Sequence, residues 1–189
     1  MMRIVLIVIA IMVGIILIVP AFIDEDVTIS RTVEINKPAE QVYNVIKDFN
    51  YYKQWNAWSQ MDKDASGEIT GSVGQVGAKW SWDGDTVGKG SLTIQELVPN
   101  QSITSRLEFV SPMTGEAQDL WNFERIDSSI TMITWTYAGS ASSYFMRYMN
   151  PMMEGMLGPQ LEIGLSNLKN LIEALEPDTS MATEEMTEE

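Results

Sequence analysis

The sequence of 189 residues contains no histidine and no cysteine. This excludes Ser-His-Asp and Cys-His catalytic sites, zinc sites built from His and Cys, thiol redox chemistry and disulfides. Basic residues are also scarce, because 12 Lys and Arg stand against 26 Asp and Glu, a net charge of −14. Nucleic acids are bound by basic surfaces, so the charge argues against a nucleic-acid partner.

Motifs for metals and cofactors are missing as well. Residues 62–67 resemble the start of a calcium loop, but Val73 stands where the bidentate Glu is required. Gly71, Gly74 and Gly77 do not follow the spacing of a dinucleotide or phosphate fingerprint. We therefore expect no metal and no cofactor, and we interpret the glycines as positions that allow strong sheet curvature.

A long apolar run occupies residues 4–23 near the N-terminus. About 20 helical residues span about 30 Å, the thickness of a bilayer core. Arg3 precedes the run and acidic residues 24–26 follow it, so the positive-inside rule places the N-terminus in the cytoplasm. Residues 1–23 are thus predicted to be a single-pass membrane anchor, with the rest of the chain on the extracytoplasmic side, which is the periplasm if the source is bacterial.

A cleaved signal peptide is the alternative interpretation of this run. Small residues occupy positions suited to a cut after Ala21, although the run is longer than the usual apolar region of a signal peptide. Both interpretations place the following domain outside the cytoplasm.

The remaining chain divides into a globular part and a tail. Residues 24–176 are enough for one domain with a full core. Residues 177–189 contain five acidic and no basic residues, and we expect a disordered acidic tail there.

Alternating apolar and polar residues predict a mostly antiparallel sheet. The first strand is expected over residues 27–35, where Val27, Ile29, Val33 and Ile35 share one face. Asp83-Gly84 is typical of a hairpin turn. Further strands joined by short turns are expected at 76–82, 88–98, 103–109, 117–126 and 130–138.

Helical spacing appears at two places. Residues 38–48 predict a short amphipathic helix, whereas residues 51–61 are interpreted as irregular and aromatic. Asn150-Pro151 is typical of a helix N-cap followed by the first helical residue. The long C-terminal helix has one apolar stripe, formed by Leu161, Leu165, Leu168, Ile172 and Leu175.

The predicted fold class is therefore α+β, with a curved antiparallel sheet of about seven strands wrapped around a long C-terminal helix. The sequence resembles the helix-grip superfamily of START domains, Bet v 1-type plant proteins and polyketide cyclase/dehydrase-like proteins. An anchor before such a domain resembles a bacterial subgroup. The residues that carry the resemblance are 33–43, Asp48-Phe49, 55–58, Gly88-Lys89-Gly90, 92–94 and 164–169.

The resemblance implies a cavity between the sheet and the C-terminal helix that holds an apolar small molecule or lipid. Aromatic residues with polar N–H or O–H groups suit the walls of such a cavity. They could also be ordinary core residues. Alternation along a strand shows which residues share a face of the sheet, but it does not show which face is the inner one. The candidate wall residues are Trp80, Trp82, Trp121, Trp135 and Tyr137.

Methionines gather before the long helix. Met146, Met149 and Met153 follow helical spacing and could form a pliable lid over the cavity, a core-facing surface or a membrane contact. Glycines at 155 and 158 with Pro159 could break the helix behind them. Arg106 would bind a polar ligand head if it pointed inward, or face solvent if it pointed outward.

Three function classes fit these observations. The first is a membrane-anchored module that binds a hydrophobic small molecule or lipid. The second is an enzyme similar to a cyclase or dehydratase, whose acid–base groups would come from Tyr137, Tyr144, Arg106 and Asp119. The third is an interaction domain of the cell envelope without a ligand. In all three function classes, we expect Trp55 and Trp58 to close the open edge of the sheet.

Overall fold

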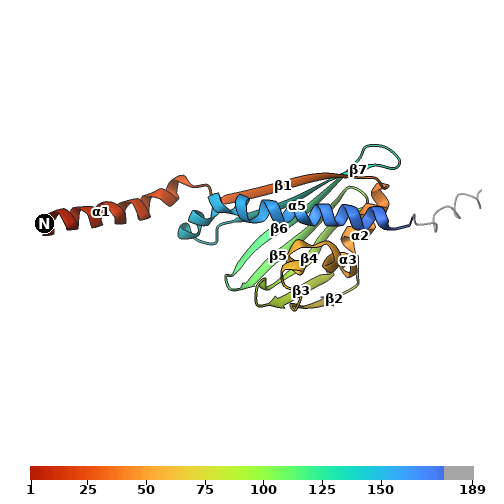
Figure 1. Ribbon diagram of the computed structural model, residues 1–189, viewed down its shortest axis with the longest axis horizontal. Coiled ribbons are helices and arrows are strands. Elements are labelled where there is room, and N and C mark those ends of the chain that lie inside the picture. The colour runs from red at the N-terminus through yellow and green to blue at the C-terminus, as the bar shows by residue number, and fades with distance from the viewer. Residues whose placement is uncertain (177–189) are drawn as a thin grey trace, which may run out of the picture.

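The computed structural model describes residues 1–176, and the predicted acidic tail lies outside them. An N-terminal helix, α1 (Met2–Ile18), continues into a short 3-10 helix, η1 (Val19–Phe22), and projects from the domain (Figure 1). Together they form one helix long and apolar enough to cross a membrane.

Seven antiparallel strands form a single sheet in the order β1-β7-β6-β5-β4-β3-β2. Strands β2 to β7 form a meander, and β1 closes the sheet beside β7. The predicted α+β helix-grip architecture is confirmed. The strands are β1 (Asp26–Ile35), β2 (Ser66–Thr70), β3 (Lys79–Gly84), β4 (Gly88–Val98), β5 (Ser102–Ser111), β6 (Gly115–Arg125) and β7 (Thr131–Ser140).

The register of the strands settles which face of the sheet is inner. Trp121 of β6 lies opposite Trp135 of β7, and Trp80 of β3 lies opposite Leu92 of β4. These side chains are buried. On the other face, the hydroxyls of Ser30 and Thr136 form a hydrogen bond of 2.8 Å between β1 and β7. The inner face is therefore apolar and aromatic, as a half-buried sheet requires.

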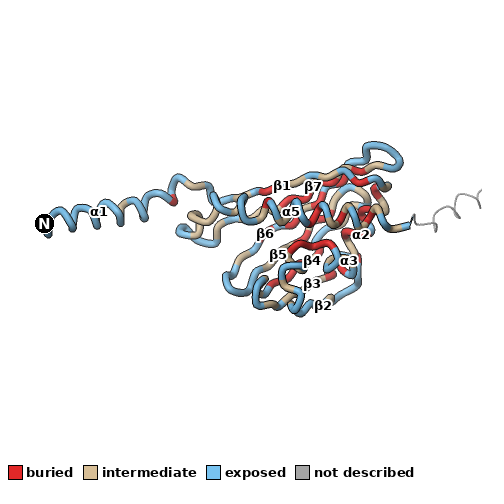
Figure 2. The backbone as a smooth tube through the Cα atoms, viewed as in Figure 1, coloured by how far each residue is buried: buried red, intermediate tan, exposed pale blue. Residues whose placement is uncertain are grey.

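The inner face is covered by α5 (Asn150–Ala174), which lies along the sheet (Figure 1). Its buried stripe includes Leu161, Leu165, Leu168 and Ile172, as the periodicity predicted. Figure 2 shows the buried residues gathered where α5, β6, β7 and α2 meet. Gly164 allows the helix to approach the sheet closely, because an added Cβ would lie 2.9 Å from the Trp135 ring.

Three short helices connect β1 to β2. They are α2 (Ala39–Lys47), α3 (Phe49–Trp55) and α4 (Ala57–Met61). The prediction for 38–48 is confirmed, but the irregular segment expected at 51–61 is wrong. Asp48 accepts a hydrogen bond from the Asn50 N–H, and Asn56 accepts from the backbone of Trp58, so each side chain caps a helix.

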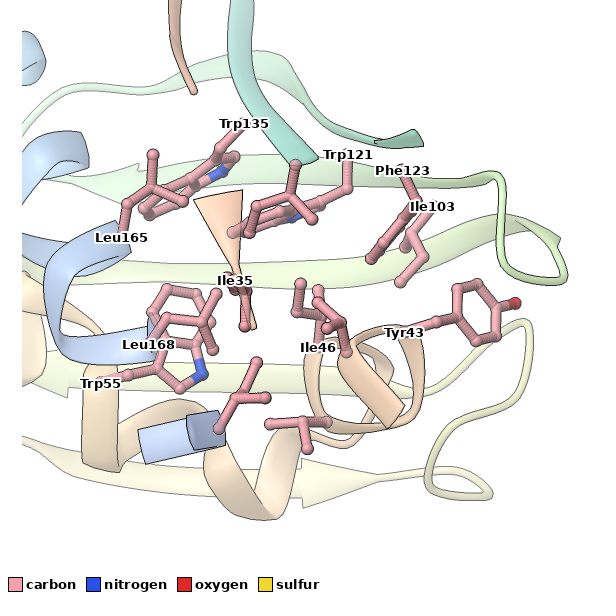
Figure 3. Packing of buried hydrophobic residues seen from close by; sticks show 14 of the residues in the cluster. Ile35, Tyr43, Ile46, Trp55, Ile103, Trp121, Phe123, Trp135, Leu165 and Leu168 are labelled. Carbon is pink, nitrogen blue, oxygen red and sulfur yellow. The ribbon is translucent and has the colours of Figure 1, made fainter. Parts of the chain in front are cut away.

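Trp55 lies at the centre of the core and not at the edge of the sheet, which corrects its predicted role. Its ring contacts Trp121 and Trp135 edge to face, at centroid distances of 5.7 and 5.4 Å. Figure 3 shows Trp55 beneath the paired rings of these two residues, next to Leu168 of α5. The end of α3 reaches this position because the Asn167 amide of α5 donates to the Trp55 carbonyl at 3.2 Å.

Two predicted features at the start of α5 are wrong. The Asn150 side chain does not cap the helix; it donates to the carbonyls of Asp24 and Glu25 at 2.7 and 2.8 Å. The helix also continues through Pro159 without a break. Buried Gly158 and Leu161 hold both sides of that proline against the domain.

The glycine-rich segment also differs from its prediction. Gly71, Gly74 and Gly77 lie between β2 and β3 with φ of 80°, 69° and 88°, so they form a loop and do not curve a strand. Asp83 and Gly84 are the last residues of β3 and pair with Lys89 and Gly88 of β4. The hairpin turn is thus residues 85–87.

Candidate functional site

A cavity of about 180 Å³ lies between the inner face of the sheet, α3, α4 and α5. Ligand pockets for drug-sized molecules are about 300–1,000 Å³, so this cavity suits a small ligand or one end of a longer one. Its lining residues come from segments far apart in the sequence. They are Tyr52, Lys53, Asn56, Trp58, Ser59, Asp62, Lys63, Ala65, Ser66, Trp80, Trp82, Val87, Leu92, Leu107, Phe109, Asp119, Trp135, Tyr137, Leu157 and Leu161.

The β3 wall of the cavity depends on two small neighbours. The Trp80 ring lies against Gly67 of β2, and the Trp82 ring lies against Gly90 of β4. In each case an added Cβ would collide with the indole. Glycine at these positions therefore lets both indoles lie close to the sheet.

Asp119 is the buried polar group of the cavity, with an exposed fraction of 8%. One carboxylate oxygen accepts from Trp121 Nε1 at 2.8 Å, and the other accepts from Trp135 Nε1 at 2.5 Å. The two indole rings are stacked, with centroids 4.7 Å apart. Burial raises the pKa of Asp119 from 3.8 to about 6, and the two hydrogen bonds oppose part of that increase.

Other polar groups share the cavity. Tyr137 is the cross-strand partner of Asp119, and burial raises its pKa. Burial, with a smaller contribution from the Asp119 charge, also raises the pKa of Tyr52. Asn56 is 1% exposed, and its Nδ2 has no hydrogen-bond partner in the described part of the chain. The cavity thus holds a buried acceptor and an amide donor.

Apart from Asp119, the charged residues that line the cavity within residues 1–176 lie on the side formed by α3, α4 and the loop after it. Lys53 and Lys63 are exposed, and the Lys53 ammonium lies 5.2 Å from the centroid of the Trp80 ring. Asp62 accepts from the backbone N–H of Thr86 at 2.8 Å, which ties this side to the β3–β4 turn. The deep part of the cavity is aromatic, with Asp119 as its charged group.

The structure brings together four of the predicted wall residues. Trp80, Trp82, Trp135 and Tyr137 all line the cavity. Trp121 lies behind them in the core and acts on the cavity through its hydrogen bond to Asp119.

Arg106 does not belong to this site, because the structure places it on the outer face of the sheet. Its guanidinium forms salt bridges with Glu108 at 2.8 Å and Glu116 at 2.7 Å. Residues of opposite parity on β5, Leu107 and Phe109, line the cavity instead. The outward alternative for Arg106 is therefore the correct one.

The methionines do not line the cavity either. Met146 and Met149 belong to a 3-10 helix, η2 (Tyr144–Met149), which lies beside the end of α1 (Figure 1). Met153 packs against the main core. The cavity receives Leu157 and Leu161 from the next turns of α5. Of the three alternatives left open for these methionines, Met153 fits the core-facing one, and the cavity lining does not include Met146, Met149 or Met153.

The sequence pattern did not identify several of the cavity residues. Trp58 was assigned to the sheet edge but lines the cavity, where its ring contacts Trp135 edge to face at 6.2 Å. The residue pattern left open whether Asp119 points inward or outward, and otherwise offered it as an acid–base group of an enzyme. It has the same parity as Trp121, so the pattern of β6 already carried a signal for an inward carboxyl group.

Within residues 1–176, no cluster of three or more acidic side chains could hold a metal ion.

A curved seven-stranded sheet that holds a long C-terminal helix, with a cavity between them, defines a helix-grip protein. The family described as polyketide cyclase / dehydrase and lipid transport matches residues 26–173, and the chain belongs to this family. No curated protein matches the sequence.

Solved structures show the same fold at low sequence identity. The Zhui aromatase/cyclase from Streptomyces sp. R1128 is similar with a TM-score of 0.61 and 17% identity, over 82% of this chain and 98% of that one. A Thermobifida fusca protein has a TM-score of 0.58 and 18% identity, over 79% and 95%. A Rhizobium leguminosarum protein has a TM-score of 0.57 and 16% identity, over 80% and 97%.

Proposed function

We propose that the protein is a membrane-anchored module that binds a small hydrophobic molecule, or one end of a lipid, between the sheet and α5. The observation that carries this proposal is the aromatic cavity with one buried carboxyl group. An aromatic wall provides apolar contact area, and a few convergent polar groups orient a ligand. The family description, which includes lipid transport, supports the same class of ligand.

Hydrogen bonds between η2 and the end of α1 support the proposed membrane anchor. The last carbonyls of a helix have no partners within it. The Tyr144 hydroxyl donates to the Leu17 carbonyl at 2.7 Å, and the Tyr148 hydroxyl donates to the Ile16 carbonyl at 3.0 Å. Tyrosines are enriched where a membrane span meets water. We therefore place the membrane surface at η2.

The test is native mass spectrometry of the full chain, purified in lipid nanodiscs and then denatured to identify what it releases. Lipids around α1 would also be released, so a matched pair of variants is needed. Leu157→Trp fills the cavity from α5, whereas Ile163→Trp places the same ring on the exposed side of that helix.

We expect wild type and Ile163→Trp to release the same compound and Leu157→Trp to release none of it. Circular dichroism checks that all three chains are folded. If Leu157→Trp retains the compound, the binding site lies outside the cavity. If wild type releases only the lipids of the nanodisc, the ligand-free interaction domain becomes the better interpretation.

One observation favours an enzyme as the second candidate function. A buried carboxyl group with a pKa of about 6 inside a cavity is suited to general acid–base chemistry. Tyr137 is its cross-strand partner and is a second potential proton donor. Incubation of the released compound with wild type and with Asp119→Asn tests this function, which predicts a product from wild type alone.

A further inference from the structure

Within residues 1–176, the Asp119 carboxylate accepts hydrogen bonds but has no oppositely charged partner. Both oxygens accept from indole N–H groups, which are neutral donors. The salt bridges within residues 1–176 involve other carboxylates, and none reaches Asp119. Two indole hydrogen bonds offset only part of the cost of burying the charge, since buried charges are ordinarily paired.

The walls around this carboxylate favour a positive charge. The faces of tryptophan and tyrosine rings carry negative potential and attract cations within about 6 Å of their centroids. Trp58, Trp80, Trp82, Tyr52 and Tyr137 all line the cavity. The ammonium of Lys53 already lies over the Trp80 ring at 5.2 Å, so a cation is accommodated on this wall.

The same features disfavour an acid in the deep part of the cavity. A ligand carboxylate or phosphate there would meet the Asp119 charge in a site that excludes most water, and like charges repel strongly under those conditions. Lys53 and Lys63 line the other side of the cavity and are exposed, so water screens them. An acidic group would thus be limited to the side that carries the two lysines.

We propose that the cavity selects a small apolar amine, whose ammonium group binds Asp119 while its apolar body packs against the tryptophans. This inference rests on the proposed binding function and names the ligand class for the same site. The volume of about 180 Å³ fits a ligand with one aromatic ring and a short chain. A cationic group would give Asp119 the charged partner that residues 1–176 do not supply.

Three probes with nearly the same apolar body test the proposal. They are 2-phenylethylamine, 2-phenylethanol and 3-phenylpropanoate, titrated calorimetrically into the full chain in nanodiscs at about pH 8, where Asp119 is ionised. Empty nanodiscs correct for partitioning into lipid. We expect the amine to bind at least about tenfold more tightly than the alcohol. The acid should bind more weakly than either.

Two variants connect this order of affinities to the carboxylate. Asp119→Asn should bind the amine and the alcohol about equally, because the charge is removed while a polar group remains. Asp85→Asn makes the same change in the exposed β3–β4 turn and should keep the wild-type order. Circular dichroism confirms folding, and the wild-type probe series is decisive even if Asp119→Asn does not fold.

The results separate this inference from the proposed function. If the alcohol or the acid binds wild type as tightly as the amine, the amine inference is wrong and the binding function stands. An amine preference that survives in Asp119→Asn also overturns it. If no probe binds while the chain still releases a compound from its cavity, the ligand is not a small amine. If no probe binds and no compound is released, both proposals fail.

Discussion

The carboxyl group of Asp119 is buried, and burial makes the largest contribution to its pKa. Burial raises its pKa from 3.8 to about 6, although two indole N–H groups favour the charged form. Desolvation therefore outweighs hydrogen bonding at this residue. The consequence is that the folded protein holds a proton at Asp119 over a pH range in which the unfolded chain releases it.

This difference predicts how stability depends on pH. Between about pH 3.8 and pH 6 the native state binds more protons at Asp119 than the unfolded state does. Proton binding therefore stabilises the fold, and the contribution is lost as pH rises through about 6. A difference of about 2 pKa units corresponds to about 3 kcal/mol over the whole range. Asp119→Asn should lack this contribution.

The measurement is urea unfolding of the full chain at several pH values between about 4 and 8. The free energy of unfolding of wild type should fall, relative to Asp119→Asn, as pH rises through about 6. The lowered pKa values of Asp127 and Glu173 act in the opposite direction but are shared by both chains. The control Asp85→Asn should show the same pH dependence of the free energy of unfolding as wild type. If wild type and Asp119→Asn show the same pH dependence, the pKa of Asp119 is not raised in the folded protein.

At the scale of elements, Gly164 decides how closely α5 approaches the sheet. An added Cβ would lie 2.9 Å from the Trp135 ring. That ring cannot move easily, because it is stacked on Trp121 and its N–H is bound to Asp119. Gly164 therefore lets α5 pack closely against Trp135, which lines the cavity.

Two glycine substitutions on α5 test this argument. Gly164→Ala should destabilise the fold by about 1–2 kcal/mol, because overpacking outweighs the gain in helix propensity. Gly155→Ala lies on the same helix with nothing within 4 Å of the added Cβ and should stabilise it by about 0.5–1 kcal/mol. Urea unfolding of both variants gives the comparison, and equal stabilisation by both would contradict the close contact.

The sequence predicted elements well where one pattern controlled them. The apolar stripe from Leu161 to Ile172 identified the buried face of α5, and alternation identified most strands. The pattern did not predict α3 and α4, because their short turns are stabilised by Asp48, Asn56 and the aromatic core. Proline disfavours the interior of a helix, so propensity predicts a break at Pro159. Helix α5 nevertheless continues, because the residues on both sides of Pro159 pack against the domain.

The candidate site was less predictable than the fold for a related reason. Parity showed that Trp80 and Trp82 share a face, but only the register of all strands identifies that face as the inner one. Arg106 and Leu107 are neighbours in sequence and lie on opposite sides of the sheet. The position of Leu157 in the cavity depends on where α5 crosses the sheet, which no local pattern encodes.

At the scale of the whole molecule, the cavity and the proposed anchor lie at different places on the domain. Tyr144 and Tyr148 hold the end of α1 at η2, whereas the side of the cavity with Lys53 and Lys63 is formed by α3, α4 and the loop after it. A ligand bound in the cavity would therefore be carried beside the membrane and not within it. This arrangement is compatible with a module that receives its ligand from the aqueous side.

The proposed orientation of the chain can be tested directly because the sequence contains no cysteine. A single cysteine is placed either at Met2, before the apolar run, or at Glu124, which is exposed on the outer face of β6. A thiol reagent that cannot cross membranes should label Glu124→Cys in cells with an intact cytoplasmic membrane. It should label Met2→Cys only after permeabilisation, since Arg3 and the amino terminus favour the cytoplasmic side.

Each alternative orientation or processing event gives a different labelling pattern. Labelling of Met2→Cys without permeabilisation, with Glu124→Cys protected, would show that the chain is inserted the other way round. Cleavage after Ala21 would separate the label at position 2 from the domain and release the domain from the membrane fraction. Recovery of the full-length labelled chain in that fraction would establish the anchor, because both ends of α1 would then belong to the mature protein.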